Sequence, residues 1–343
     1  MNSKKKFLVR WNLTGFAFIL ALTMPTALKA KSIENVNNVD RQEIAQNNNP
    51  AYYYNQGNQA YDRGNYQQAV KEYTSAINLN PKLADAYYNR GLALVQLSNY
   101  QGAIADYNKA IELNPQYTKA YYNRANIRYN LGDPQGAIAD YNKAILLDPN
   151  LANAYVGRGN VRDDLGKPQG AIADYNKAIE LDANNFYAYY NRGVTRYRLK
   201  QFATAISDYD RAISLNDRYI DAYYNRGLAH YSLGQKKKAF ADYSKTIELN
   251  PNYALAYVGR GNVRDDFEDI QGAIADYNKA IGIDANLADA YYNRGITLFK
   301  IANKQAALTD WIKAANIYQK QGNIPAYQNT LKLIQNNARV ESI

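Results

Sequence analysis

A tyrosine followed by an asparagine recurs along this chain at intervals of 34 residues or a multiple of 34. The pairs are Tyr54–Asn55, Tyr88–Asn89, Tyr122–Asn123, Tyr190–Asn191, Tyr224–Asn225 and Tyr292–Asn293. An asparagine side chain can both donate a hydrogen bond to a peptide group and accept one from it. A tyrosine ring supplies contact area at a low cost in side-chain entropy. We call the two sets the tyrosine column and the asparagine column, and their chemistry favours recognition of another molecule.

An arginine with an aspartate sixteen residues after it recurs at the same interval. The pairs are Arg90 with Asp106, Arg124 with Asp140, Arg158 with Asp174, Arg192 with Asp208, Arg226 with Asp242, Arg260 with Asp276, and Arg294 with Asp310. Before them, Gln56 stands at the arginine position and Glu72 at the aspartate position, and this joint change suggests that the two side chains meet. A guanidinium group binds a carboxylate through two parallel hydrogen bonds. We therefore interpret these residues as structural pairs, with a small net stability because desolvation offsets attraction.

The sequence contains no recognisable set of catalytic residues. The absence of cysteine excludes disulfides, thiolate metal sites and a cysteine nucleophile, and His230 is the single histidine. Residues 157–159 and 259–261 begin like a dinucleotide fingerprint, but Arg162 and Arg264 replace its third glycine, and both segments have helical spacing. We expect no enzyme, no catalytic residue, no cofactor and no metal site, and we interpret His230 as structural.

All of these residues belong to a unit of 34 residues that recurs eight times without insertion or deletion. Its most regular positions are Gly57, Gly91, Gly159, Gly193, Gly227, Gly261 and Gly295, with Ala125 in the one gap, and Ala69, Ala103, Ala137, Ala171, Ala205, Ala239, Ala273 and Ala307. In the unit 84–117, two runs of small and apolar residues have helical spacing, separated by Ser98 and Asn99 and ended by Pro115. Each unit is predicted to be an antiparallel helix pair, which buries its apolar face only by stacking on its neighbours.

The unit resembles the tetratricopeptide repeat. The residues that carry the resemblance in the second unit are Tyr87, Gly91, Ala103, Tyr107, Ala110 and Pro115. The resemblance implies an all-α fold, a right-handed superhelical α-solenoid of about eight helix pairs. The units are 50–83, 84–117, 118–151, 152–185, 186–219, 220–253, 254–287 and 288–321. Apolar residues with helical spacing after residue 321 predict a capping helix and tail over 322–343.

The resemblance also implies a function. In tetratricopeptide arrays the first helices line a concave groove, which would place the tyrosine and asparagine columns there, projecting into solvent. The asparagine column resembles the ladder with which peptide-binding arrays grip a ligand backbone. We expect a non-enzymatic scaffold, an assembly factor or adaptor, that binds an extended segment of a partner protein. An RNA-binding helical-repeat protein and a recruiting subunit of an enzyme complex are the alternatives. The convex face or the turns, including Lys236–Lys238, are the alternative location of the site.

The N-terminus is typical of a secretory signal over residues 1–30: a basic start, an apolar run from Leu13 to Met24, and small residues up to Ala30. These residues carry five basic and no acidic side chains, half of the formal net charge of +10, so a nucleic-acid partner is not favoured. We expect cleavage near Lys31, an Asn-rich flexible spacer over 31–49, and no membrane span afterwards. Resemblance of the repeat consensus to cyanobacterial proteins implies export to the periplasm or thylakoid lumen. An uncleaved anchor over residues 7–24 is the alternative.

Overall fold

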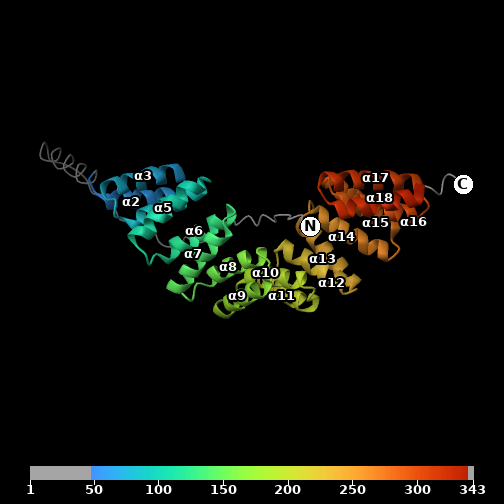
Figure 1. The fold of residues 1–343 in the computed structure, drawn as a ribbon, viewed down its shortest axis with the longest axis horizontal. Coiled ribbons are helices and arrows are strands. Elements are labelled where there is room, and N and C mark those ends of the chain that lie inside the picture. Colours follow the sequence, from blue (N-terminus) through green and yellow to red (C-terminus); the bar gives the residue numbers. More distant parts are fainter. Residues whose placement is uncertain (1–47, 339–343) are drawn as a thin grey trace, which may run out of the picture. The chain divides into compact units, whose positions relative to one another are not determined.

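The computed structural model describes residues 48–338, which form seventeen helices and no strand (Figure 1). The helices follow one another in packed pairs. The pairs are α2 (Pro50–Asp62) with α3 (Tyr66–Leu79), α4 (Ala84–Gln96) with α5 (Tyr100–Leu113), α6 (Thr118–Asn130) with α7 (Pro134–Leu147), α8 (Ala152–Asp164) with α9 (Pro168–Leu181), α10 (Phe186–Arg198) with α11 (Phe202–Leu215), α12 (Ile220–Ser232) with α13 (Lys236–Leu249), α14 (Ala254–Asp266) with α15 (Ile270–Ile283), and α16 (Ala288–Lys300) with α17 (Lys304–Lys320). The last helix is α18 (Ile324–Ala338). The predicted signal segment, and all but the end of the predicted spacer, lie outside the described residues.

The described chain falls into two compact parts, residues 48–181 and 182–338, and each is considered by itself. Within each part, the second helix of a pair packs against the first helix of the next pair. First helices of consecutive pairs also contact one another, as α2 does α4 and α12 does α14. We call the side on which the first helices approach each other the first-helix face. The stack of helix pairs confirms the predicted α-solenoid.

The glycine positions are explained by the tyrosine that each second helix buries. Tyr107 on α5 is completely buried, and a Cβ atom added to Gly91 on α4 would lie 2.6 Å from its ring. The ring therefore packs directly on the backbone of the first helix. In the last pair Trp311 replaces the tyrosine and packs on Gly295 in the same way. Glycine at this position thus lets a large aromatic side chain fill the space between two helices.

Short turns join the two helices of each pair. One turn residue adopts positive φ, as Gly132 does at 85° and Ser98 at 59°, a conformation that costs glycine little. In several pairs the next helix then begins at a capping side chain; Asn99, for example, accepts a hydrogen bond from the backbone N–H of Gly102. This cap satisfies one of the free N–H groups at the helix start.

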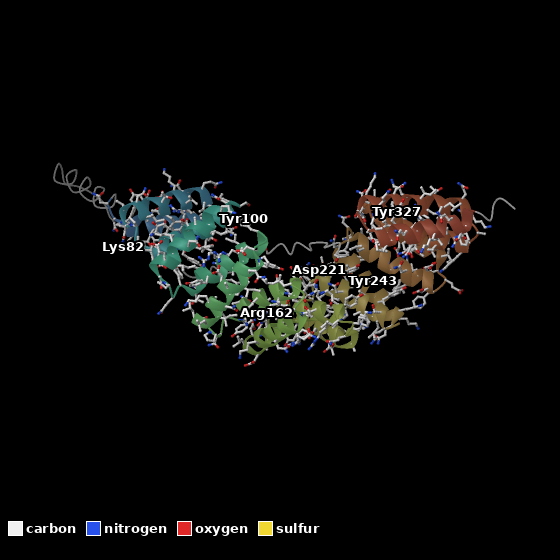
Figure 2. The ribbon with its side chains drawn as sticks, viewed as in Figure 1. Lys82, Tyr100, Arg162, Asp221, Tyr243 and Tyr327 are labelled. Carbon is white, nitrogen blue, oxygen red and sulfur yellow. The ribbon has the colours of Figure 1, made fainter. Side chains whose placement is uncertain are left out.

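The last helix covers the open end of the array. Ala326 and Tyr327 of α18 pack against Ile317 and Tyr318 of α17; Tyr327 is labelled in Figure 2. The predicted C-terminal capping helix is therefore confirmed, although its first residue, Ile324, is 49% exposed. Within residues 48–338, no helix combines the length and the apolar character needed to cross a membrane.

Candidate ligand-binding face

The structure places each arginine of the arginine–aspartate pairs against the aspartate of its own helix pair. Arg90 Nε donates to Asp106 Oδ2 at 2.8 Å and Arg90 Nη2 to Asp106 Oδ1 at 2.7 Å. The other pairs repeat this contact in Arg124–Asp140, Arg158–Asp174, Arg192–Asp208, Arg226–Asp242, Arg260–Asp276 and Arg294–Asp310. The seven aspartates are all buried. The pairs therefore join the first helix to the second with a bidentate, largely desolvated contact.

The same arginines also reach the preceding helix pair. Arg90 Nη1 donates to Thr74 Oγ1 on α3 at 3.0 Å, and its guanidinium carbon lies 5.5 Å from the centroid of the Tyr87 ring. Arg158 Nη1 likewise donates to Asn142 on α7 at 2.7 Å. One guanidinium group thus connects three helices, which fixes how one unit stacks on the next.

Sequence reasoning missed a second set of basic residues, four positions after the first set. Arg128, Arg162, Arg196 and Arg264 contact Asp140, Asp174, Asp208 and Asp276, at 2.7 to 3.0 Å. Arg162 is labelled in Figure 2. His230 has this position beside Asp242, with 3.9 Å between Nε2 and Oδ2. In two units a leucine, Leu94 or Leu298, stands there instead. The spacing of four residues, which puts two side chains on one face of a helix, could have revealed this set.

The tyrosine column lies against the buried tyrosines of the second helices. Ring centroids are 5.8 Å apart for Tyr88 and Tyr107, and 6.0 Å for Tyr190 and Tyr209. Burial raises the pKa of Tyr88 to about 12. Burial likewise raises the pKa of Tyr122, Tyr190 and Tyr224. The rings of the tyrosine column are therefore partly buried and do not project freely into solvent as the sequence suggested.

The asparagine column is bonded to the tyrosine column of the preceding unit. Asn123 Nδ2 donates to Tyr88 Oη at 2.9 Å, and Asn225 Nδ2 donates to Tyr190 Oη at 2.9 Å. Asn89 makes the same bond to Tyr54 at 3.0 Å. Asn123, Asn191, Asn225 and Asn293 are partly buried, and only Asn55, in the first unit, is fully exposed. Among the described residues, Asn123 Oδ1 and the hydroxyl proton of Tyr88 have no hydrogen-bond partner. We call these three bonds, Tyr54–Asn89, Tyr88–Asn123 and Tyr190–Asn225, the ladder; it is interrupted where Val156 and Val258 replace the tyrosine.

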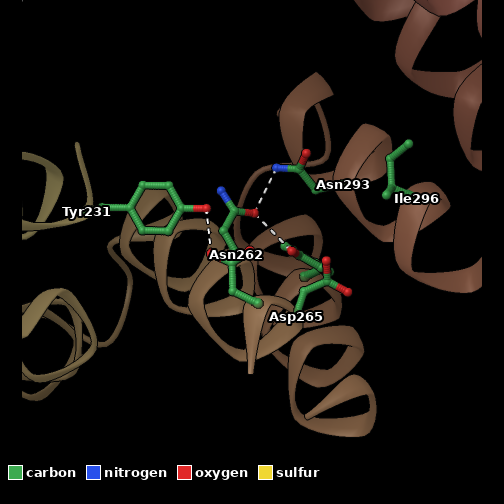
Figure 3. A pocket seen from close by; sticks show the side chains of 7 residues that line it. Tyr231, Asn262, Asp265, Asn293 and Ile296 are labelled. Carbon is green, nitrogen blue, oxygen red and sulfur yellow. Dashed lines mark hydrogen bonds between the residues drawn. The ribbon is translucent and has the colours of Figure 1, made fainter. Parts of the chain in front are cut away.

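Asn293 of the asparagine column borders a cavity of about 180 Å³ in the second compact part (Figure 3). The lining residues are Tyr231, Asn262, Asp265, Asp266, Tyr277, Asn293 and Ile296. Asn262 Oδ1 accepts from Tyr277 Oη and from Asn293 Nδ2, both at 2.9 Å, which orients the amide and leaves its NH₂ group without a partner among the described residues. Tyr231 Oη donates to Asp266 at 2.9 Å. Burial and this bond raise the pKa of Tyr231 to about 12.

The same cluster of one tyrosine and two asparagines occurs in the first compact part. Asn58 Oδ1 accepts from Tyr73 Oη at 2.8 Å and from Asn89 Nδ2 at 3.0 Å. Where a leucine or valine replaces the first asparagine, as at Leu92 and Val194, the hydroxyl groups of Tyr107 and Tyr209 are buried without a partner among residues 48–338. At this position the first-helix face therefore carries amide groups in some units and apolar side chains in others.

Sequence models of the family match along most of the array. A model of the TPR repeat matches residues 57–98, 159–200, 195–234 and 268–301, and a model of the tetratricopeptide repeat matches 84–117, 118–151 and 220–253. Together the matches span more than half of the chain. The chain is a tetratricopeptide repeat protein. No curated protein sequence matches it significantly.

Solved tetratricopeptide repeat structures resemble the fold. A tetratricopeptide repeat protein from Parabacteroides merdae is 21% identical, with 73% of this chain and 98% of that chain covered and a TM-score of 0.55. MamA is 32% identical over 48% of this chain and 96% of its own, with a TM-score of 0.45. YrrB, described as a TPR protein with an unusual peptide-binding site, is 28% identical over 54% of this chain and 95% of its own, with a TM-score of 0.47. The first of these supports the repeat fold and nothing further.

The face has no constellation typical of metal or acid–base chemistry. Residues 48–338 contain no group of three or more histidines and carboxylates that could hold a metal ion. His230 Nδ1 lies 2.7 Å from Gln235 Oε1, so the histidine is engaged within its own turn. What the face offers is amide and hydroxyl groups, held in place by the ladder, on a tetratricopeptide repeat scaffold.

Proposed function

We propose that this tetratricopeptide repeat protein is a non-enzymatic scaffold that binds an extended segment of a partner protein along its first-helix face. The observation that carries the proposal is the ladder between the asparagine and tyrosine columns. It fixes the direction of each amide and leaves a carbonyl acceptor, as at Asn123, beside a hydroxyl donor, as at Tyr88. A peptide backbone in extended conformation offers the complementary donor and acceptor at every residue.

The ladder also reduces the conformational entropy that the side chains of this face would lose when a ligand binds. Side chains that are already held by internal hydrogen bonds lose little rotamer freedom when a ligand arrives. Carboxylates at the same face, Asp265 and Asp266 in the cavity, oppose the approach of a phosphate backbone. A protein segment is therefore favoured over a nucleic acid. The role as an assembly factor or adaptor in an exported compartment is part of this proposal.

The proposal is tested with peptides selected from a display library against the full-length protein. The variant Asn123→Ala with Asn225→Ala removes one ladder amide from each compact part. The ladder bond uses one of the two N–H groups of each amide. Each substitution removes at least the carbonyl acceptor, and each ligand hydrogen bond lost is worth about 0.5–1.5 kcal/mol. Each substitution should therefore raise the Kd of a peptide bound at its own compact part by roughly twofold to tenfold.

The matched control removes two other asparagines that also hold a hydrogen bond. Asn108 and Asn278 lie on second helices, exposed, and accept from Arg124 Nη1 and Arg294 Nη1 at 2.5 Å. Replacing both with alanine should leave Kd unchanged. Equal affinities of the two double variants, at matched thermal stability, would move the binding site away from the first-helix face.

A further inference from the structure

A second cavity lies at the turns between helices, apart from the tyrosine and asparagine columns. It has a volume of about 330 Å³, and its lining residues are Lys237, Phe240, Arg264, Phe267 and Asp269. They come from α13, from α14 and its end, and from the residue before α15. We call this cavity the edge pocket. Its wall includes Phe267, a large apolar side chain that is 48% exposed.

The edge pocket is preformed. The Arg264 guanidinium carbon lies 5.7 Å from the centroid of the Phe240 ring. Arg264 Nη1 donates to the Gly272 carbonyl at 3.0 Å, and Arg264 Nε lies 3.5 Å from Asp269 Oδ2. Asp269 in turn accepts from the Gly272 backbone N–H at 3.0 Å. A ligand would therefore find the arginine and one ring already ordered, which reduces the entropy lost on binding.

The two phenylalanines are peculiar to this place in the array. The residues at the position of Phe240 in the other units are Val70, Ile104, Ile138, Ile172, Ile206, Ile274 and Leu308. Those at the position of Phe267 are Arg63, Leu97, Leu131, Leu165, Leu199, Leu233 and Ile301. Aliphatic side chains thus suffice for repeat packing at both positions. The aromatic pair is not required by the fold.

Three lysines at the start of α13, of which Lys237 lines the edge pocket, are also not required by the fold. Lys236–Lys238 form the first turn of α13, where the helix dipole disfavours positive charge. No side chain caps this helix. Lys236 lies 3.2 Å from Asp266, whereas Lys237 and Lys238 have no ion-pair partner among residues 48–338. Two unpaired lysines therefore lie in the first turn of α13, and one of them, Lys237, lines the edge pocket together with Phe267.

We propose that the edge pocket docks an acidic segment of a partner protein. A large apolar side chain of that segment enters the cavity against Phe240 and Phe267, and its flanking carboxylates face Lys237 and Lys238. The choice of partner follows from charge complementarity. Asp266 and Asp269 are already paired with Lys236 and Arg264, so Lys237 and Lys238 leave two unpaired positive charges near the pocket against the one unpaired carboxylate of Glu268. A cavity suits one side chain, which favours a peptide over a bilayer surface. The site is independent of the ladder.

The test uses the full-length protein and a dye-labelled decapeptide of aspartate and glutamate with one central tryptophan. Fluorescence anisotropy measures Kd for the wild type, for Phe267→Ala, and for Lys237→Gln with Lys238→Gln. Phe267→Ala should raise Kd about tenfold, since it removes an apolar contact of about 1.4 kcal/mol. The double lysine variant should raise Kd roughly fivefold in low salt and have little effect at about 1 M salt, where charges are screened.

Matched controls come from the next helix pair. Ile301 has the position of Phe267 and is 45% exposed, and Lys304 has the position of Lys236. Ile301→Ala and Lys304→Gln should leave Kd unchanged. For a peptide with serine in place of tryptophan, the wild type and Phe267→Ala should bind with the same Kd. The proposal is overturned if the wild type fails to bind the decapeptide at about 1 mM, if the controls weaken binding equally, or if the protein binds phosphatidylserine vesicles through Phe267 but not the peptide. Because Asn123→Ala leaves this site intact, failure here is distinct from failure of the first-helix face.

Discussion

Removing Arg90 should destabilise its helix pair more than removing Arg124 destabilises the next one. Both arginines bind the aspartate of their own pair through two hydrogen bonds, reach the preceding second helix through Nη1, and lie 5.5 Å from a tyrosine ring. They differ in what remains after removal. Asp140 keeps its hydrogen bond from Arg128 at 2.9 Å. In α4 the position of Arg128 is taken by Leu94, and among residues 48–338 no second arginine contacts Asp106.

The magnitude follows from the burial of the two carboxylates. Asp106 is 5% exposed and Asp140 is 3% exposed, so neither can recover its hydration without a local rearrangement. A buried carboxylate left without a partner costs about 3–5 kcal/mol. A retained charge-assisted hydrogen bond is worth about 1.5–3 kcal/mol. We therefore expect Arg90→Met to cost about 2 kcal/mol more than Arg124→Met, and Arg90→Met with Asp106→Leu to cost less than Arg90→Met alone.

The measurement is native-state hydrogen exchange of the amides in α4 and α5 against those in α6 and α7, in the full-length protein. A local measurement is needed because repeat arrays need not unfold in one step. Equal losses of protection in the two single variants would show that Arg128 does not compensate. No coupling between Arg90 and Asp106 in the double variant would refute the interpretation of the pair as one structural unit.

Three further predictions follow from the described contacts and from the N-terminal sequence. Tyr175→Phe should lower the free energy of unfolding by about 0.5–1.5 kcal/mol, because it breaks the hydrogen bond to Asn160 at 2.8 Å. Tyr107→Phe should be neutral or stabilising, because that hydroxyl is buried without a partner in the described chain. Thermal denaturation measures both variants, and equal losses of stability would contradict the prediction. Burial raises the pKa of Tyr88 to about 12, and an unfolded tyrosine ionises near pH 10, so its contribution to stability should be complete below about pH 10 and lost as the pH rises toward 12. Phenolate absorbance and circular dichroism recorded together check this, and ionisation of all tyrosines near pH 10 with the helices intact would disprove it. The mature protein should begin near Lys31, and N-terminal sequencing that finds Met1 in a soluble cytosolic fraction would end the proposal of export.

The fold could be predicted almost completely because the same pattern of small and apolar residues recurs in eight units of 34 residues. Helix pairs, the glycine and alanine positions and the capping helix all follow from helical spacing and from the need to cover an open end. The meeting of Arg90 with Asp106 could also be anticipated, because both positions change in the first unit. The second arginine, as at Arg128, was within reach of the same reasoning and was missed.

The extent to which the side chains of the tyrosine and asparagine columns are buried could not be predicted. A column shows which residues share a position but not how far each unit is rotated against the next. That rotation puts Asn123 beside Tyr88, 35 residues earlier in the chain, and turns an expected row of free side chains into a hydrogen-bonded ladder. The edge pocket was hidden for the same reason, because α13, α14 and the turn after α14, from two consecutive units, build it.

Photo-cross-linking at position 123 tests the central claim most directly. A photoreactive phenylalanine analogue replaces Asn123 on the first-helix face, and in a second protein it replaces Leu146 on α7, which is 73% exposed. Each full-length protein is irradiated with a peptide selected by display against the wild type. The peptide should cross-link at position 123 and not at position 146, in a reaction that excess unlabelled peptide suppresses. Cross-linking at position 146 alone would place the ligand on the second helices and contradict the account.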